Sequence, residues 1–335
     1  MLAPIRGTNQ YWFHVKGEVK AMIAEYSSPT LFLTLSCAEY NSADIAQYLR
    51  KVNNAPQSYS ISRLYTEDPV SVLRQFSYKF KDFFNIVILQ RGVLGKVEQY
   101  YVTKEYQMRG ALHYHILLWI EYAPVVSIDC REGVIQDRIT CHIPDSNTSP
   151  DLNYLVTKYQ MHKCSKYCKR NIKVGKTYVS RCRFDFPRPV RDSICINDVE
   201  NSLKSCNKIY YLKQNEKEVR VNDYNPLLLK LWRANMDLQY IAERSLSLTE
   251  YVTAYVTKAE KSHALDLWDE VRSCDNIYSM LWKIGQKLLR TKEVGLYEAS
   301  NLLLGESSYM KSVTVQYVNV YLPHKRSRKI KNIHI

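Results

Sequence analysis

Residues 105–119 read Glu-Tyr-Gln-Met-Arg-Gly-Ala-Leu-His-Tyr-His-Ile-Leu-Leu-Trp. His113 and His115 stand two apart in an apolar run, and such residues point to the same face of a β-strand. Two imidazoles side by side are the beginning of a metal site. Glu105 offers a carboxylate as third ligand, with Arg109-Gly110 as a turn before the histidines. The alternative interpretation is two polar residues near the end of a buried strand.

Composition limits the classes of protein to be considered. The chain has 335 residues, enough for two or three compact units with cores of their own. It carries 47 Lys and Arg against 33 Asp and Glu, a formal net charge of +14. That balance suits a polyanionic partner such as nucleic acid, although an ordinary basic protein has the same balance. Exposed rings among the 27 tyrosines are suited to stacking on unpaired bases, or they are plain core and surface residues.

Targeting signals and cysteines indicate the compartment. The sequence has no run of 18 apolar residues, so no transmembrane helix is expected. Charged residues interrupt the apolar residues of the first 28 positions, which do not resemble a signal peptide. The nine cysteines are therefore expected in a reducing compartment, where clustered cysteines more often bind metal than form disulfides.

Periodicity divides the chain into three parts. The first is expected to hold helices and strands at 15–26, 30–36, 68–89, 97–106 and 112–120, with Asp68 capping a helix that begins at Pro69. Residues 121–225 contain most of the cysteines and only one periodic segment, 150–161. In the last part helices are expected at 226–242, 248–260 and 264–304, a strand at 312–322, and then a basic tail at Lys325–Lys331.

Four residues of the cysteine-rich part have ligand spacing. His162, Cys164, Cys168 and Cys182 form the pattern H-x-C-x3-C-x13-C. Zinc in structural sites takes four nitrogen or sulfur ligands in a tetrahedron, and closing a loop of this length is feasible. The spacing is looser than that of paired C-x2-C motifs. A structural zinc site and reduced structural thiols both remain open.

Tyr251 and Tyr255 are four residues apart in a helical pattern and so share one helix face. Phenolic oxygens held near a divalent cation can act as nucleophiles. Tyr317 and Tyr321 have the same spacing but fall in an alternating, strand-like pattern. The triplet Gly175-Lys176-Thr177 is not a phosphate-binding loop, because the required earlier glycine is replaced by Arg170. No ATPase motor is therefore expected in this chain.

Together these elements resemble the Helitron helicase-like N-terminal domain, the replication-initiator region of Helitron transposases. The resemblance covers about residues 5–305 and rests on the order and spacing of five motifs. The matching residues are Phe32–Ser36, Glu105, Gln107, Arg109-Gly110, His113–Leu118, then His162, Cys164, Cys168, Cys182, Phe186 and Pro187, then Asp223–Leu227, and finally Tyr251, Tyr255 and Lys258.

The resemblance implies an HUH endonuclease of the α+β class. Its core would be an HUH-type central antiparallel sheet flanked by helices, with a Cys-rich insertion. The implied divisions are an N-terminal part of the nuclease core with the histidine strand, a Cys-rich insertion with the candidate zinc ligands, a tyrosine-helix part of the core, and a strand with the basic tail. Their bounds are 1–125, 126–222, 223–305 and 306–335.

The implied chemistry is nicking and joining of single-stranded DNA in rolling-circle-like transposition in the nucleus. Mg²⁺ or Mn²⁺ would be held by His113, His115 and Glu105, with Gln107 as the rival third ligand. Tyr251 or Tyr255 would attack the phosphate and leave a 5′-phosphotyrosine and a free 3′-OH, with Lys258 beside them in the same motif. The second tyrosine could serve a second strand transfer.

The chain departs from the family pattern in three places. Ala111-Leu112 replaces the usual Leu-Pro before the histidines, and Glu250 and Ala254 replace lysines beside the tyrosines. Loss of those positive charges would weaken phosphate binding. An alternative function is therefore a non-catalytic DNA-binding fragment of a truncated or domesticated transposase. The Cys-rich insertion argues against a viral-type replication initiator. The helicase motor that follows this region in the family is not expected here, so no DNA unwinding is expected.

Overall fold

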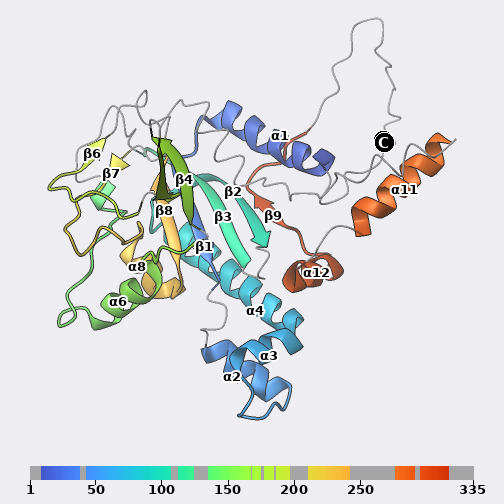
Figure 1. Cartoon of the computed structure of the whole chain (residues 1–335), viewed down its shortest axis with the longest axis horizontal. Helices are drawn as coiled ribbons and strands as arrows, with labels where there is room; N and C mark the ends of the chain where they lie inside the picture. The colour runs from blue at the N-terminus through green and yellow to red at the C-terminus, as the bar shows by residue number, and fades with distance from the viewer. Residues whose placement is uncertain are drawn as a thin grey trace, which may run out of the picture.

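A five-stranded antiparallel sheet organises the computed structural model (Figure 1). The strand order is β8-β1-β3-β2-β9. The strands are β1 (Leu31–Ser36), β2 (Val97–Tyr106), β3 (Leu112–Ile120), β8 (Met236–Tyr240) and β9 (Tyr309–Lys311). The structure describes residues 9–37, 43–106, 112–123, 135–166, 168–174, 177–184, 186–196, 210–241, 276–290 and 295–316.

The central strands follow the sequence pattern closely. β2 and β3 have the bounds expected from their apolar and aromatic residues, and β1 differs from its expected bounds by one residue. β3 is the central strand of the sheet, between β1 and β2, and it is buried along almost its whole length. Its register pairs His115 with Thr34 of β1 and His113 with Glu105 of β2.

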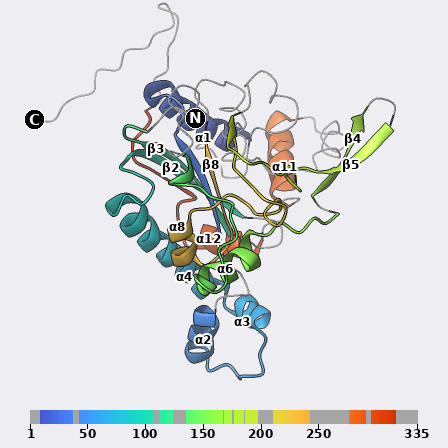
Figure 2. The ribbon, with the colours of Figure 1, turned by 90° about the vertical axis from the view of Figure 1, so that its left-hand side faces the viewer.

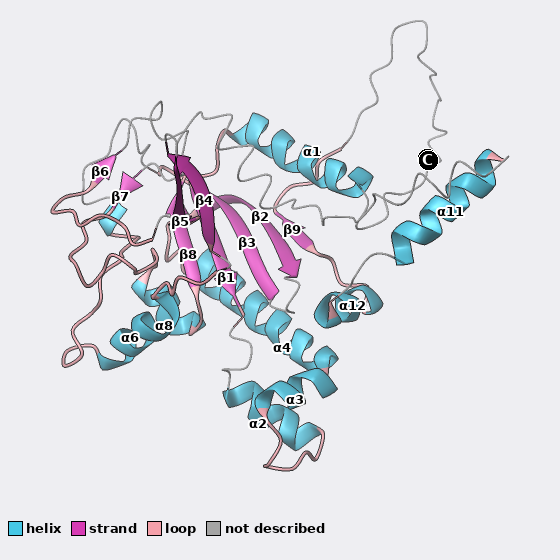
Figure 3. Ribbon diagram, viewed as in Figure 1, coloured by secondary structure: helices cyan, strands magenta, loops and turns pink. Residues whose placement is uncertain are grey.

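Each face of the sheet packs against different helices. On the face that carries Tyr114, α4 (Pro69–Asp82) and the π-helical segment η1 (Phe83–Gln90) pack over the strands, and the Phe80 ring stacks on Tyr114 at 3.7 Å between centroids. On the face that carries the histidines, α1 (Asn9–Tyr26) is joined to β9 by an ion pair between Glu18 and Lys311. Figure 3 shows the sheet between these helices.

Smaller helices complete the first and last parts of the described chain. α2 (Ala43–Val52) and α3 (Ile61–Glu67) pack together below α4 in Figure 1. α12 (Leu296–Leu303) packs against α4 and leads into β9, and α11 (Ile277–Arg290) precedes it. As predicted, α4 begins at Pro69, and the Asp68 side chain accepts a hydrogen bond from the Ser71 N–H.

The described residues of the cysteine-rich part have little regular structure, in agreement with the weak periodicity of their sequence. It contains α6 (Pro150–Leu155), the π-helical segment η2 (Val156–Gln160), and two small antiparallel pairs. One pair is β4 (Lys169–Val174) with β5 (Thr177–Cys182), and the other is β6 (Cys195–Ile196) with β7 (Tyr210–Tyr211). Figure 2 shows the hairpin of β4 and β5 projecting away from the central sheet.

One predicted helix is wrong over half its length. The helix expected at 226–242 ends early, because α8 (Pro226–Trp232) is followed by Arg233 in the left-handed conformation and then by β8. Met236, Leu238 and Tyr240 alternate toward the core, and pairing with β1 outweighs their local helix preference.

The C-terminal strand is also displaced from its expected position. It was expected at 312–322, but β9 occupies Tyr309–Lys311 and pairs with β2. Residues 312–316 are not strand, and 317–322 lie outside the described residues. The α+β class with a central antiparallel sheet is confirmed. In the described part of the chain, no helix is long and apolar enough to cross a membrane.

Candidate metal centres

Glu105, His113 and His115 meet on one face of the central sheet. Register places Glu105 of β2 directly opposite His113 of β3, and His115 lies two residues further along the same face. One ligand atom from each of the three side chains lies within 4.8 Å of the others. The Nε2 atom of His115 is 2.7 Å from a carboxylate oxygen of Glu105. A divalent ion could therefore contact all three groups.

Thr34 orients His115 from the neighbouring strand. Its hydroxyl lies 3.1 Å from Nδ1 of His115, while Nε2 of the same ring faces Glu105. Phe32, two residues before Thr34, stacks on the His115 ring at 5.8 Å. The imidazole is thus held by a hydrogen bond on each nitrogen and by an aromatic ring on one side. Sequence reasoning assigned no role to Thr34, because its contact depends on which residues face each other across β1 and β3.

The three side chains differ in their access to solvent. His115 is 4% exposed, whereas His113 and Glu105 are only half-buried. A metal held here would be fixed on its buried side and open on the other. Catalytic metal sites keep such an open position for water or substrate, whereas structural sites are closed.

A second cluster lies in the cysteine-rich part. Ligand atoms of His162, Cys164, Cys168 and Cys182 all lie within 4.8 Å of one another, with Nε2 of His162 3.3 Å from Sγ of Cys182. Three thiols and one imidazole are a donor set of structural zinc sites. The cluster is thus compatible with structural zinc.

The surroundings of Cys168 and His162 favour the protonation states that bind metal, whereas burial raises the pKa of the Cys182 thiol. The Ser165 N–H donates a hydrogen bond to Sγ of Cys168 at 3.2 Å, and this is the main interaction that lowers the pKa of the Cys168 thiol. Burial, helped by Arg220 and Arg188, lowers the pKa of His162. Arg220 also places a guanidinium nitrogen 3.6 Å from Sγ of Cys164. A thiolate and a neutral imidazole are the forms that coordinate zinc.

Several predicted site residues lie outside the described residues. They are Gln107 and Arg109-Gly110 after β2, Ala111 before β3, and Tyr251, Tyr255 and Lys258 in the segment 242–275. Gln107 is the alternative to Glu105 as third metal ligand. Only Glu105 lies among the described residues, so the geometry of the site is known for Glu105 alone.

The motif at 223–227 has structural roles. Asp223 is fully buried and forms an ion pair with the buried guanidinium of Arg188. The Tyr224 hydroxyl donates to the backbone carbonyl of His142 at 2.7 Å. The Asn225 side chain accepts hydrogen bonds from the first backbone N–H groups of α8, with Pro226 in its first turn. This motif joins the cysteine-rich part to the start of α8. Arg188 was missed because no spacing in the sequence links it to Asp223.

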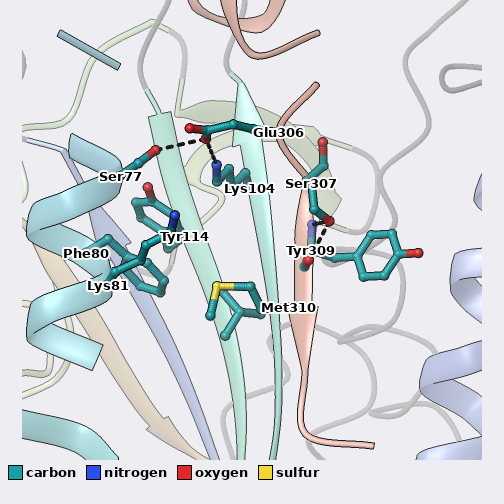
Figure 4. Close-up of a pocket in the computed structure, with 11 residues that line it drawn as sticks. Ser77, Phe80, Lys81, Lys104, Tyr114, Glu306, Ser307, Tyr309 and Met310 are labelled. Atoms are coloured by element: carbon teal, nitrogen blue, oxygen red, sulfur yellow. Dashed lines mark hydrogen bonds and ion pairs between the residues drawn. The ribbon is translucent and has the colours of Figure 1, made fainter. Parts of the chain in front are cut away.

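A cavity lies on the opposite face of the sheet from the histidines. It has a volume of about 230 Å³ between α4, β2 and the segment before β9 (Figure 4). Lys104 forms an ion pair with Glu306 at 2.9 Å there, and the Ser77 hydroxyl donates to Glu306 at 3.3 Å. Lys104 alternates with Glu105 along β2, so this cavity is separate from the His/Glu cluster.

Comparison with known proteins identifies the N-terminal part. Residues 1–118 match the protein family described as "Helitron helicase-like domain at N-terminus". This region is similar to the Helitron helicase-like domain. The match covers 118 of the 335 residues, including Glu105, His113 and His115, and ends before the Cys/His cluster. No curated protein matches the chain significantly.

Proposed function

We propose that this protein is an HUH-type endonuclease that nicks and rejoins single-stranded DNA in rolling-circle-like Helitron transposition. The observation that carries the proposal is the convergence of Glu105, His113 and His115 on one sheet face, inside the region that matches the Helitron helicase-like domain. The division into a nuclease core interrupted by a Cys-rich insertion is part of the same proposal. β8 and β9 support it, because both come after the insertion in sequence and both join the central sheet.

The donor set favours one of the two expected metals. Two imidazoles and one carboxylate suit Mn²⁺ more closely than Mg²⁺, which prefers oxygen ligands and keeps several waters. When bound, such an ion would polarise a scissile phosphate. His115 and Glu105 would hold it from the buried side. His113, which is less buried, would complete the set near the substrate.

In the proposed reaction the phenolic oxygen of Tyr251 or Tyr255 attacks the DNA phosphorus. The new bond joins that oxygen to the 5′-phosphate, and the bond from phosphorus to the 3′-oxygen breaks. The tyrosine proton is lost and the departing 3′-oxygen gains one, which yields a free 3′-OH. Lys258 would interact with the negative phosphate from the same motif.

Chain length permits this attack. β8 lies beside β1, and Asp237 of β8 is opposite Thr34, which is opposite His115. Tyr251 lies ten positions after Ile241, which directly follows β8. An extended chain of that length spans about 33–36 Å. Asp237 and Ile241 are separated by about 13 Å of strand. Chain length therefore allows the tyrosines to approach the His/Glu cluster.

Charge and the second cluster complete the proposal. A net charge of +14 suits binding of the phosphate backbone, and a nuclear location follows from the role in transposition. A structural zinc ion at the Cys/His cluster would stabilise an insertion that has little core of its own. The zinc would be separate from the catalytic ion.

A nicking assay tests the catalytic role. Labelled single-stranded DNA is incubated with Mn²⁺ and the wild-type protein, His113→Ala or His115→Ala. Each substitution should reduce the rate about 10²-fold or more, equivalent to several kcal/mol of transition-state stabilisation. His142→Ala is the matched control, because His142 also contacts a glutamate, Glu218 at 3.1 Å, but lies outside both clusters. Nicking that survives both substitutions and removal of the metal would refute the proposal.

A non-catalytic DNA-binding protein is the second candidate. Replacement of two motif lysines by Glu250 and Ala254 favours it, because both changes remove positive charge beside the tyrosines. The same assay separates the two functions. A protein that binds single strands and retains its metals but never cleaves them would be of this second kind.

A further inference from the structure

The hairpin of β4 and β5 lies in the most basic segment of the Cys-rich insertion. Residues 163–184 contain eight Lys or Arg and no Asp or Glu, so the segment contributes +8 to a chain of net charge +14. The basic residues are Lys163, Lys166, Lys169, Arg170, Lys173, Lys176, Arg181 and Arg183. A segment of one sign that projects from the fold generates a strong local positive potential.

The described side chains of the hairpin are not part of a core on either face. The described side chains of β4 and β5 are exposed on both sides, apart from Cys182 at the base. Figure 2 shows both strands extending away from the central sheet. A two-stranded hairpin is marginally stable by itself in water. This one is therefore expected to depend on what holds its base and on what covers its faces.

The Cys/His cluster holds the base. Cys168 immediately precedes β4, and Cys182 ends β5 opposite Lys169. The Arg183 N–H also donates to the Cys168 carbonyl at 2.7 Å. Ligation of both cysteines would fix the two strands where they leave the fold. The hairpin would then be presented in a defined orientation.

One face places two like charges side by side. Arg170 lies directly opposite Arg181 in the register of the hairpin, and both side chains are exposed. Like charges at directly opposite positions destabilise a strand pair. Among the ion pairs of the described residues, none includes Arg170 or Arg181. A polyanion bound across this pair would turn the repulsion into attraction.

The other face presents hydrogen-bonding groups. Asn171 pairs with Ser180, Lys169 lies on the same face, and Tyr178 further along is 70% exposed. The ribbon thus offers cationic groups on one face and polar groups with a cation on the other. The major groove of B-DNA, about 12 Å wide, admits a two-stranded β-ribbon between two phosphate backbones. A single strand offers no such groove.

We infer that the β4–β5 hairpin binds double-stranded DNA by entering the major groove, with Arg170 and Arg181 contacting phosphates. This inference rests on the proposed function only in taking DNA as the partner. The hairpin would bind the double-stranded DNA that adjoins the single strand. The His/Glu cluster would act on the single strand itself. Binding by the hairpin does not require cleavage.

The test measures affinity for a fluorescein-labelled duplex by fluorescence anisotropy over a range of salt concentrations, without added divalent metal. The variant is Arg170→Ala with Arg181→Ala. Arg74→Ala with Arg91→Ala is the matched control, because both of these arginines are exposed and lie on α4 or just after η1. Loss of two phosphate contacts should make the slope of log K against log salt shallower by about 1.8 on duplex. The control should keep the wild-type slope.

Three results would overturn the inference. The first is an unchanged slope in the hairpin variant, and the second is an equal change in the control. The third is an equal loss on the single strand of the same sequence, which would assign the hairpin to single strands. Circular dichroism and zinc content establish that the variants are folded. If the wild-type protein never nicks DNA but its duplex affinity depends on the hairpin, the nuclease proposal fails and this inference stands.

Discussion

The Thr34 hydroxyl and the His115 ring are partners across β1 and β3, 3.1 Å apart. When no metal is bound and the ring proton is on Nε2, Nε2 donates to Glu105 and Nδ1 accepts a hydrogen bond from the Thr34 hydroxyl. When a metal binds Nε2, the ring proton is on Nδ1, and Nδ1 then donates to the Thr34 hydroxyl. A hydroxyl serves both states because it is donor and acceptor. Thr34 therefore supports the histidine with and without a metal.

Replacing Thr34 by valine should weaken metal binding. Valine keeps the shape of threonine but removes the hydroxyl, so the Nδ1 proton of a metal-bound His115 loses its acceptor. Partners of this kind typically contribute about 10–100-fold to metal affinity. Mn²⁺ titration followed by electron paramagnetic resonance measures the change. Thr34→Ser retains the hydroxyl and should bind almost as the wild type does. Equal affinity of the valine and wild-type proteins would show that Thr34 has no such role.

Zinc content tests the Cys/His cluster. Protein purified under reducing conditions should contain about one zinc ion per chain, because a closed site of four protein ligands binds zinc tightly. Cys164→Ser should lose the zinc and destabilise the insertion. Cys37→Ser is the control, since Cys37 is buried and lies outside both clusters. Reduced, folded wild-type protein without zinc would leave the four residues as structural thiols.

The sequence predicted those features that depend on local patterns. Alternation and apolar composition located β2 and β3, and i,i+2 spacing placed His113 and His115 on one face. Asp68 and Pro69 marked a helix start because capping is local. The four ligands of the second cluster were recognised because they occur within 21 residues of chain.

Features that depend on long-range pairing were not predictable from one sequence. β8 was mistaken for helix, because its residues become a strand only by pairing with β1 about 200 positions earlier. The partner of Asp223 was missed for the same reason, since Arg188 lies 35 residues away with no periodic link. Thr34 and His115 are 81 residues apart. Each of these contacts requires the fold before it can be recognised.

Removing the carboxylate of Asp223 should destabilise the protein strongly. Asp223→Ala would leave the buried guanidinium of Arg188 without this charge partner, and breaking a buried pair in this way costs about 3–5 kcal/mol. Urea denaturation followed by circular dichroism measures the free energy of unfolding. Asp151→Ala breaks the exposed pair with Arg233 and should cost only about 0–1 kcal/mol. Similar losses in both variants would contradict the structural role of the buried pair.

Glu306 should make stability depend on acid pH. Partial burial acts to raise its pKa, but the hydrogen bonds and charges around it, chiefly those of Lys104, together lower it below the ordinary 4.5. A lowered pKa in the folded state stabilises the protein fully above about pH 4.5, and this stabilisation is lost as pH falls through the folded-state pKa. The free energy of unfolding of wild type relative to Glu306→Gln should therefore shrink below pH 4.5. Urea unfolding across the pH range measures it.

The exposed pair of Arg63 and Glu67 provides the control for that experiment. Both side chains are about half exposed, so solvent screens their attraction. Glu67→Gln should lower the free energy of unfolding at neutral pH only slightly. If the Glu306→Gln difference does not change with pH, the attraction between Glu306 and Lys104 does not favour the carboxylate in the folded protein.

The covalent step makes the sharpest prediction, because it leaves the protein bonded to DNA. After cleavage of labelled single strands, a denaturing gel should show a protein–DNA adduct, and peptide mass mapping should place the 5′-phosphate on Tyr251 or Tyr255. Either tyrosine alone could support one cleavage when the two share a helix face.

Tyr251→Phe with Tyr255→Phe removes both phenolic oxygens while keeping both rings, so the adduct should disappear while DNA affinity remains. Tyr317→Phe with Tyr321→Phe has the same spacing and is the control, which should form the adduct normally. An adduct that maps to Tyr317 or Tyr321, or that persists in the first double variant, would assign the nucleophile to a different residue.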